Sequence, residues 1–307
     1  RTGRVVEVAV GEELLGSTID SLGHGIDPAK PIAPMQELRP VDREPPGVEA
    51  RARITRPCQI GVSIVDLMLP LGKGQRELVI GDQKTGKSRF LIRSLTAQVR
   101  EGAIGVYAII GKSRVIAKQV EERLRVMNVM ERIVLVMSGA QDSAAMVYLT
   151  PYTAMTIAEY FRDRGEDVIL VLDDLSVHAK AYRELSLIAK RFPGRNSYPG
   201  DIFYAHARLL ERAGNFLTAN GERAITCLPA VEAPYGDLSG YIQTNVMSMT
   251  DGHLFFDHML FAEGRRPAID IFLSVTRVGR QTQSRLRQEI GRELILFLRS
   301  VEKMHAF

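Results

Sequence analysis

Eight consecutive residues have the spacing of a phosphate-binding loop. In such a loop, glycines let successive backbone N–H groups point at phosphate oxygens, and the positive end of the following helix adds to the attraction. The segment fits the pattern G-x-x-x-x-G-K-[ST] at each fixed position. It reads Gly81, Asp82, Gln83, Lys84, Thr85, Gly86, Lys87 and Ser88. We predict that Lys87 reaches the β and γ phosphates of ATP or ADP, and that the Ser88 hydroxyl binds Mg²⁺.

The alternative, a chance glycine-rich turn, is disfavoured by the context, because an apolar strand pattern ends at Ile80 and a helical pattern begins at Ser88. A second apolar run, Asp167–Leu172, is followed directly by Asp173 and Asp174. A carboxylate after such a strand holds the magnesium shell beside the phosphate loop. We favour Asp173 for this role because it directly follows the run. Asp174 fits another common role of aspartate, capping the next helix.

Short apolar runs alternate with helical patterns over the segment that contains these residues. Strands are predicted at Glu77–Ile80, Ile104–Ile110, Arg132–Met137, Asp167–Leu172, Ala224–Leu228 and Ile269–Ser274. Helices are predicted at Ser88–Arg100, Arg114–Val126 and Asp142–Arg164, with a cap at Asp142–Ser143. Strands separated by helices of this length indicate βαβ units and a mostly parallel, buried sheet. The sequence therefore predicts a three-layer α/β fold.

The two ends of the chain carry other patterns. Arg4–Val10 alternates as a short strand would, and six prolines before Pro57 make 28–57 an extended connector outside the core. Gln281–Phe307 has a helical pattern without a stop signal. We expect three parts: a β and extended segment at 1–57, a nucleotide-binding domain at 58–290, and the start of a helical region at 291–307.

The composition is that of an ordinary globular protein. The 307 residues are 45% hydrophobic and 25% charged, with a formal net charge of +4. The small positive surplus suits acidic ligands, but no Lys/Arg-rich block predicts a nucleic-acid partner. No apolar run reaches the length of about 18 residues that a membrane span needs, and residues 1–11 are not a signal peptide, so we expect a soluble protein.

Cysteines and histidines give no sign of a metal site. Cys58 and Cys227 are far apart, and we expect both to be reduced thiols. Four histidines lack metal-ligand spacing and are expected at the surface or in hydrogen bonds: His178, His206, His253 and His258.

Further blocks of residues follow one another in the order of one known family. They are Gly72–Leu78, Asp173–Ser176, Ala181–Leu187, Phe192–Arg195, Tyr198–Tyr204, Arg208–Ala213, Tyr241–Ile242, Thr244–Val246, Thr250–Gly252 and Ser274–Gly279. Through these blocks the sequence resembles the alpha subunits of F-type ATP synthases. The resemblance implies a RecA-like P-loop NTPase core that binds ATP or ADP with Mg²⁺. It makes residues 1–57 the end of the family's N-terminal β-barrel with a connector, and 291–307 the beginning of its C-terminal helical domain. Most of both flanking domains is not matched.

The resemblance also bears on catalysis. Catalytic beta subunits of that family carry a glutamate in a G-E-R context after the strand that follows the P-loop helix, and it positions the attacking water. Here Lys112 stands in that place, and the next acids, Glu121 and Glu122, lie about 13 Å further along a helix. Because a protonated lysine cannot act as this base, we expect the site to bind nucleotide and hydrolyse it poorly.

Some positions depart from the usual alpha pattern. The family usually has glutamine at Lys112, Arg-Gln at Gln83–Lys84, and glutamate at Asn196. These changes bear on the affinity and nucleotide preference of the site. Two alternatives stand for Lys112: it tightens binding of the γ-phosphate, or it points to solvent.

The expected contribution to chemistry is Arg277. Within the Ser274–Gly279 block it resembles the arginine finger that reaches from alpha into the adjacent beta site. A guanidinium there stabilises the phosphoryl-transfer transition state, worth about 10³–10⁵ in rate. Ser274 is expected to support its placement. The alternative is an ordinary surface arginine, as Arg280 and Arg285 lie close by.

The implied partners are a catalytic beta-type subunit and the central-stalk subunit of a ring that couples ATP synthesis or hydrolysis to proton or sodium flow. The chain would then be cytoplasmic and peripheral, at the inner face of the energy-coupling membrane, which it meets only through other subunits. One alternative is a self-sufficient homohexameric motor of the flagellar, secretion or RNA-translocase type. Lys112 argues against it, as does the lack of an aromatic and basic RNA platform. The other alternative is a degenerate nucleotide-binding assembly protein.

Overall fold

The computed structural model of the protein describes residues 5–29 and 31–305. The strands of its central sheet are β2 (Thr18–Ile19), β6 (Glu77–Gly81), β7 (Ile104–Lys112), β8 (Ile133–Gly139), β9 (Val168–Asp173), β10 (Gly214–Thr218), β11 (Gly221–Glu232), β12 (Gly252–Phe256) and β13 (Ile269–Thr276). Within the described residues this is a nine-stranded sheet in the order β13-β12-β6-β11-β9-β7-β8-β2, with β10 paired to β11 outside that path. The strands from β12 to β2 run parallel, whereas β13 and β10 are antiparallel to β12 and β11.

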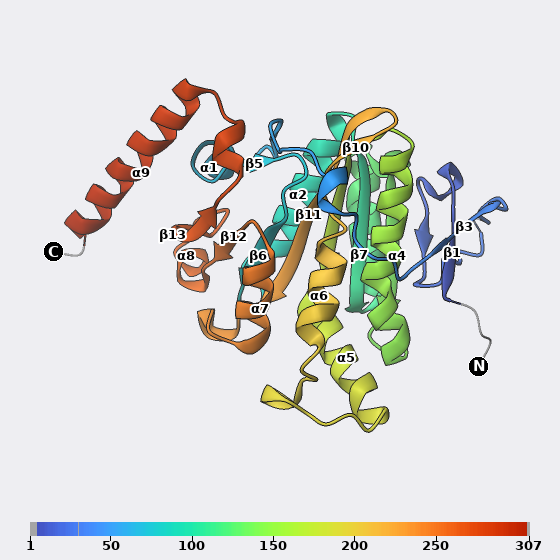
Figure 1. Ribbon diagram of the computed structural model, residues 1–307. Helices are drawn as coiled ribbons and strands as arrows, with labels where there is room; N and C mark the ends of the chain where they lie inside the picture. Colours follow the sequence, from blue (N-terminus) through green and yellow to red (C-terminus); the bar gives the residue numbers. More distant parts are fainter. Residues whose placement is uncertain (1–4, 30, 306–307) are drawn as a thin grey trace.

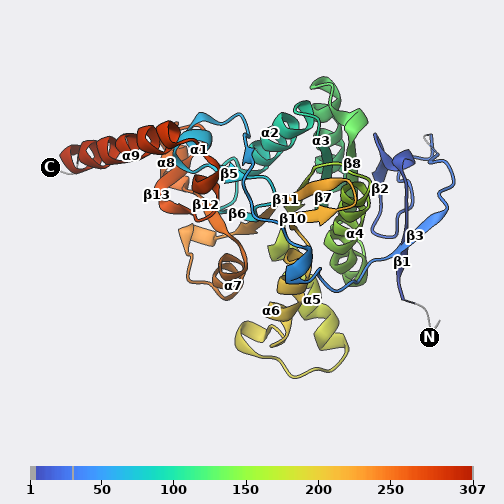
Figure 2. The same cartoon turned by 45° about the horizontal axis from the view of Figure 1, so that its top comes forward.

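Helices cover both faces of the sheet, as Figures 1 and 2 show. They are α1 (Ser63–Met68), α2 (Lys87–Arg100), α3 (Arg114–Val126), α4 (Ala144–Asp163), α5 (Leu175–Ile188), α6 (Ile202–Leu210), α7 (Tyr241–Met249), α8 (His258–Ala262) and α9 (Arg285–His305). Side chains of the strands alternate between two cores. Val79 and Tyr107 pack with α2 and α3, whereas Leu78 and Val106 pack with α4, α5 and α6. The predicted three-layer α/β fold with a mostly parallel sheet is therefore confirmed.

Each predicted strand and helix of the core is present, with ends displaced by a few residues. The predicted cap of α4 is Ser143, whose hydroxyl accepts a hydrogen bond from the Met146 N–H at 3.4 Å. Asp142 instead accepts from the Gly139 N–H at 2.7 Å and closes the turn that leads into the helix. Strands β10 and β12 were not expected from the sequence.

The proline-rich segment was predicted as a connector outside the core, and this is wrong for part of it. Strand β3 (Glu37–Pro40) pairs antiparallel with β1 (Glu7–Val10), and Val41 is buried in the main core. Near its end, β4 (Pro57–Cys58) pairs antiparallel with β5 (Leu71–Gly72). The described part of the predicted first strand matches β1, while Arg4 lies outside the described residues.

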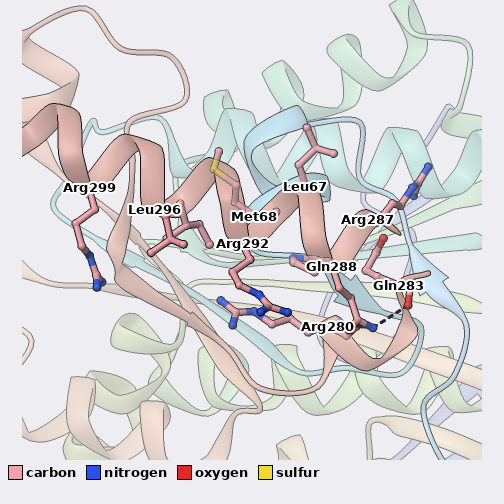
Figure 3. A pocket seen from close by; sticks show the side chains of 12 residues that line it. Leu67, Met68, Arg280, Gln283, Arg287, Gln288, Arg292, Leu296 and Arg299 are labelled. Carbon is pink, nitrogen blue, oxygen red and sulfur yellow. Dashed lines mark hydrogen bonds between the residues drawn. The ribbon is translucent and has the colours of Figure 1, made fainter. Parts of the chain in front are cut away.

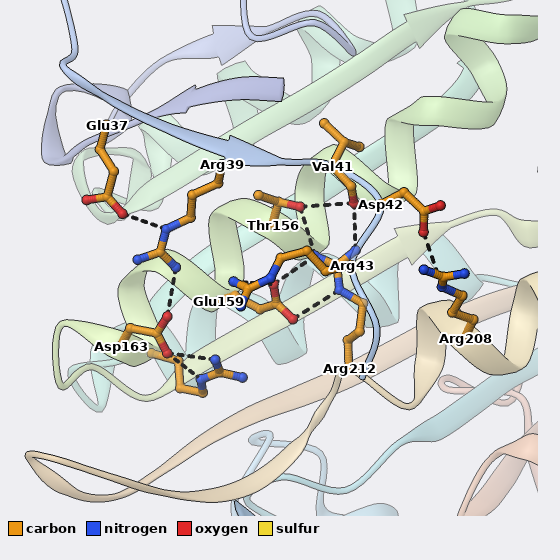
Figure 4. Close-up of polar contacts among 11 residues, drawn as sticks. Glu37, Arg39, Val41, Asp42, Arg43, Thr156, Glu159, Asp163, Arg208 and Arg212 are labelled. Carbon is orange, nitrogen blue, oxygen red and sulfur yellow. Dashed lines mark hydrogen bonds and ion pairs between the residues drawn. The ribbon is translucent and has the colours of Figure 1, made fainter. Parts of the chain in front are cut away.

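A buried arginine holds this segment to the body of the molecule (Figure 4). Arg212 is fully buried, and its guanidinium donates to both carboxylate oxygens of Glu159 on α4, at 3.0 and 2.8 Å. It also donates to the Thr156 hydroxyl at 2.8 Å and to the Val41 carbonyl oxygen at 2.8 Å. The N-terminal segment is thus attached to α4 by a charge-assisted network in the core.

Helix α9, the last element that the structure describes, extends from the body on the side opposite β1 and β3 (Figure 1). It begins at Arg285, later than the predicted Gln281, because residues Gly279–Thr282 form a 3₁₀ turn. The predicted end at Phe307 lies outside the described residues. Among the helices that the structure describes, none combines the length and apolar character that crossing a membrane requires.

Candidate nucleotide-binding site

The phosphate loop lies between the carboxyl end of β6 and the start of α2. Its two glycines are required by the backbone. A Cβ atom on Gly81 would lie 2.3 Å from the carbonyl oxygen of Phe256 on β12, which is too close for any side chain. Gly86 has a φ angle of 97° and is the N-cap of α2, a left-handed conformation that favours glycine. The loop therefore presents its backbone at a helix N-terminus, the arrangement that binds phosphate.

The remaining loop residues hold this shape through local hydrogen bonds. The Lys87 ammonium donates to the carbonyl oxygens of Gly81 at 2.8 Å and Asp82 at 2.6 Å, and burial lowers the pKa of Lys87. The Thr85 hydroxyl donates to the Asp82 carbonyl oxygen at 2.8 Å. The Asp82 carboxylate accepts from the Tyr235 N–H at 3.0 Å. The Lys87 ammonium therefore lies against the backbone of the loop.

The two adjacent aspartates have different environments. Asp173, the last residue of β9, accepts hydrogen bonds on Oδ2 from the Ser88 hydroxyl at 3.2 Å and from the buried Tyr107 hydroxyl at 2.8 Å. Asp174 caps α5 by accepting from the Val177 N–H at 3.0 Å, so its predicted capping role is confirmed. Burial, and then the charge of Asp173, raises the pKa of Asp174 to about 6. Asp173 is therefore the carboxylate that lies beside the phosphate loop.

Lys112, the last residue of β7, has its ammonium nitrogen 2.5 Å from Oδ1 of Asp173. Its side chain is 18% exposed, so the alternative in which it points to solvent is wrong. The more distant acid Glu121, on α3, accepts hydrogen bonds from Thr18 on β2 and from Arg125 on α3. A lysine that is paired with Asp173 therefore occupies the position at which the catalytic beta subunits of the resembled family carry their glutamate base.

Two site residues were missed by sequence reasoning. Tyr107 could not be identified because its contact with Asp173 depends on the register of β7 beside β9, in which Tyr107 lies opposite Val171. Glu232 ends β11 opposite Gly81 and accepts a hydrogen bond from the Gln83 amide at 3.2 Å. Its signal was the position of an acid at the end of a long apolar run.

The donor set fits magnesium. Mg²⁺ prefers oxygen ligands, usually one or two protein groups together with nucleotide phosphates and water. The Ser88 hydroxyl and the Asp173 carboxylate supply two such oxygens beside the loop, and these two atoms lie 3.2 Å apart. Bound there, Mg²⁺ would neutralise phosphate charge. Lys112 shares the same carboxylate, so a cation at this place meets a protein cation already paired with it.

Arg277 and this loop lie at opposite ends of the strands: the loop follows the carboxyl end of β6, and Arg277 is level with the beginning of β6. In the register across β12, Thr276 is level with Glu77 at the start of β6, whereas the loop begins at Gly81. Four residues of strand separate the two levels by about 13 Å. The Arg277 side chain is exposed, and within residues 5–29 and 31–305 it forms no hydrogen bond or ion pair. The structure does not bring Arg277 together with the phosphate loop of its own chain.

Ser274 holds the strand that ends at Arg277. Strand β13 has an irregular register opposite β12, and Ser274 lies at this irregularity. Its buried hydroxyl accepts a hydrogen bond from the Phe255 N–H at 2.9 Å and donates to the carbonyl oxygen of Asp270. It therefore fixes the course of the chain three residues before Arg277.

Comparison with known proteins identifies the family of this chain. A family model described as the ATP synthase alpha/beta family, nucleotide-binding domain, matches residues 61–276. The chain belongs to the ATP synthase alpha/beta family. Over 306 residues it is 42% identical to the ATP synthase subunit alpha of Clostridium botulinum (strain Eklund 17B / Type B) and 44% identical to that of Clostridium acetobutylicum. These alignments cover the whole of this chain and 60% of each relative, so the chain spans about 60% of the length of the curated relatives it matches.

Membership of the ATP synthase alpha/beta family confirms the resemblance that the sequence blocks indicated. One of those blocks contains Arg212, whose role in the structure is the buried contact with Glu159. The predicted histidine environments are confirmed as well. His178 and His206 form a buried pair with ring nitrogens 3.1 Å apart, His253 contacts the Leu273 carbonyl oxygen at 2.8 Å, and His258 is exposed.

A cavity of about 380 Å³ lies between α1 and α9, which follows Arg277 in the chain (Figure 3). The residues around it in the described part of the chain include no aspartate or glutamate. Four arginines and two glutamines contribute to its lining: Arg280, Arg287, Arg292, Arg299, Gln283 and Gln288. We call this the arginine groove. It is lined by positive charge, and the first of its arginines, Arg280, lies three residues after Arg277 in the chain.

Proposed function

We propose that this chain is an alpha-type subunit of an F-type ATP synthase that binds ATP or ADP with Mg²⁺ and hydrolyses it poorly on its own. The observation that carries the proposal is the pairing of Lys112 with Asp173 beside a complete phosphate loop. The groups that would hold the phosphates are the Lys87 ammonium, the Ser88 hydroxyl and the backbone N–H groups of the loop. The group that would activate water is replaced by a cation, which cannot accept a proton.

The position of Arg277 supports a contribution to a neighbouring subunit. It is exposed, and its level in the sheet lies about 13 Å from the phosphate loop of its own chain. A guanidinium that serves phosphoryl transfer must lie against the transferred group. Arg277 would therefore act in trans, on a nucleotide in an adjacent catalytic beta-type subunit, with Ser274 fixing its strand.

The arginine groove supports the same arrangement. Four guanidinium groups on one face fit a partner surface that is rich in carboxylates, because Arg–carboxylate pairs form strong bidentate contacts. We propose that a beta-type subunit provides this surface. The complete ring would contain the central-stalk subunit as well, lie peripherally at the inner face of the energy-coupling membrane, and couple ATP turnover to proton or sodium flow. Residues 58–290 would form its nucleotide-binding domain, between barrel and helical flanking regions.

The proposal is tested by measuring nucleotide binding and ATP turnover with the purified chain alone. We expect calorimetric binding of ADP and ATP with MgCl₂, phosphate release close to background, and loss of binding in the Lys87→Met variant. Rapid hydrolysis by the isolated chain would instead identify a self-sufficient motor. An absence of binding would leave only an assembly role.

A further inference from the structure

We propose that the Lys112 ammonium acts as a built-in cation for the nucleotide site, so that ADP and ATP bind with little dependence on Mg²⁺. The inference rests on the proposed nucleotide-binding function and goes beyond it, because it assigns a ligand preference to one residue. In the structure, the ammonium nitrogen of Lys112 lies 2.5 Å from Oδ1 of Asp173. The other oxygen of that carboxylate accepts from Ser88 and Tyr107. Both oxygens of Asp173 are therefore already engaged by donors of the chain itself.

The backbone aims Lys112 at this carboxylate. Strands β7 and β9 are parallel neighbours in which Ile109 lies opposite Asp173. Strand β7 continues past that point, and its pairing with β8 becomes irregular between Ile109 and Lys112. At the irregularity Gly111 has a φ angle of 61°, a conformation suited to glycine, and its N–H donates to the Ser138 hydroxyl at 3.0 Å. Lys112 is thus held by the fold in front of the neighbouring strand.

Charge decides what this contact does to an incoming nucleotide. The Asp173 carboxylate lies within hydrogen-bond distance of Ser88, on the first turn of the helix that follows the phosphate loop. A bare carboxylate there repels phosphate, and in most sites of this kind a divalent cation removes the repulsion. The side chains of Lys112 and Asp173 are only 18% and 8% exposed, so salt screens their attraction weakly. Lys112 therefore cancels the repulsion before any metal arrives.

The contact between Lys112 and Asp173 also reduces the gain in nucleotide affinity that Mg²⁺ can provide. To bind Asp173, Mg²⁺ must displace the ammonium or share the carboxylate with it, whereas the Ser88 hydroxyl and the phosphates remain available. A neutral side chain at position 112 leaves the carboxylate unpaired, so the metal regains its full effect. Dependence on Mg²⁺ is consequently a property that Lys112 sets.

The test compares the Kd of ADP by calorimetry in excess MgCl₂ and in excess EDTA. The matched variants are Lys112→Gln and Lys118→Gln, because Lys118 is an exposed lysine on α3 that loses the same charge away from the site. We expect the ratio of the two Kd values to stay within about threefold for the wild-type chain and for Lys118→Gln. For Lys112→Gln it should rise to about tenfold or more, the scale of one hydrogen bond between charged groups. Lys112→Arg, which keeps the charge, should restore a low ratio.

A high ratio in the wild-type chain, or equal ratios in wild type and Lys112→Gln, would overturn the inference while leaving nucleotide binding intact. Failure of the wild-type chain to bind ADP in either solution would overturn the proposed function itself. The two failures are therefore distinguishable in one set of titrations. Circular dichroism of each variant confirms that the fold is retained.

Discussion

Replacement of one member of the Arg212–Glu159 pair should destabilise the protein severely, and replacement of both should cost less. Arg212 is fully buried and Glu159 is 2% exposed. In Glu159→Met the buried guanidinium keeps its contacts with Thr156 and Val41 (Figure 4) but loses its counter-ion. In Arg212→Met the carboxylate of Glu159 keeps, among the residues that the structure describes, a contact with Arg43 alone, at 4.0 Å.

The magnitude follows from the burial. Removing one partner of a buried ion pair leaves an uncompensated charge and costs about 3–5 kcal/mol. Removing both charges together with apolar side chains of similar volume avoids that penalty and is often close to neutral. The Arg212→Met/Glu159→Met double variant should therefore lose about 2 kcal/mol or less, mainly from the hydrogen bonds to Thr156 and Val41.

Urea unfolding followed by circular dichroism measures these differences, and a double-mutant cycle isolates the coupling between the two side chains. We expect a coupling energy of about 3 kcal/mol or more, with each single variant less stable than the double. Single variants that lose under about 1 kcal/mol each would refute the reasoning. So would a double variant whose loss equals the sum of the two.

Two further outcomes can be checked with single variants. Burial lowers the pKa of His206 from 6.5 to about 4 and that of His178 well below 6.5, so both are neutral in the folded protein while the unfolded chain takes up protons below pH 6.5. Their contribution to stability is complete above pH 6.5 and is lost as the pH falls towards 4. For His206 alone this loss amounts to about 3 kcal/mol. In a His206→Leu variant the urea midpoint should therefore fall less steeply with pH over this range, and a dependence as steep as that of the wild-type chain would contradict the lowered pKa of His206. Ser274→Ala should lower kcat of the assembled complex by about tenfold to a hundredfold, because it displaces the strand that carries Arg277, with KM nearly constant; a change confined to KM would argue against a positioning role.

The core of the fold could be predicted because its strands are buried on both faces and read as continuous apolar runs. Val168–Leu172 is such a run, and strand β9 ends one residue beyond it, at Asp173. The patterns failed where burial comes from tertiary contacts. Val41 follows a proline-rich stretch, yet its side chain is buried in the main core, and Arg212 binds its carbonyl oxygen. Strand β11 continues through Pro229, a residue that argues against a central strand.

The residues of the site likewise fall into two groups: those that local sequence patterns predict and those that tertiary structure places. The phosphate loop and the choice of Asp173 over Asp174 followed from local spacing, and the capping by Asp174 agrees with it. The side chain of Lys112 could not be placed from the sequence, because its direction depends on the irregular end of β7 and on the strand beside it. Tyr107 and Glu232 join the site only through strand register. Contacts between neighbouring parallel strands are set by tertiary structure, and a single sequence does not specify them.

The most direct test of the central claim is ATP turnover by the natural full chain assembled with a catalytic beta-type subunit. The compared variants are Arg277→Ala and Arg285→Ala, the latter removing an arginine whose side chain is 94% exposed. If Arg277 acts on the neighbouring nucleotide, its loss should lower turnover by about 10³-fold or more, while Arg285→Ala changes it by less than about twofold. Equal, small effects of the two variants would contradict the claim that this chain supplies a catalytic arginine in trans.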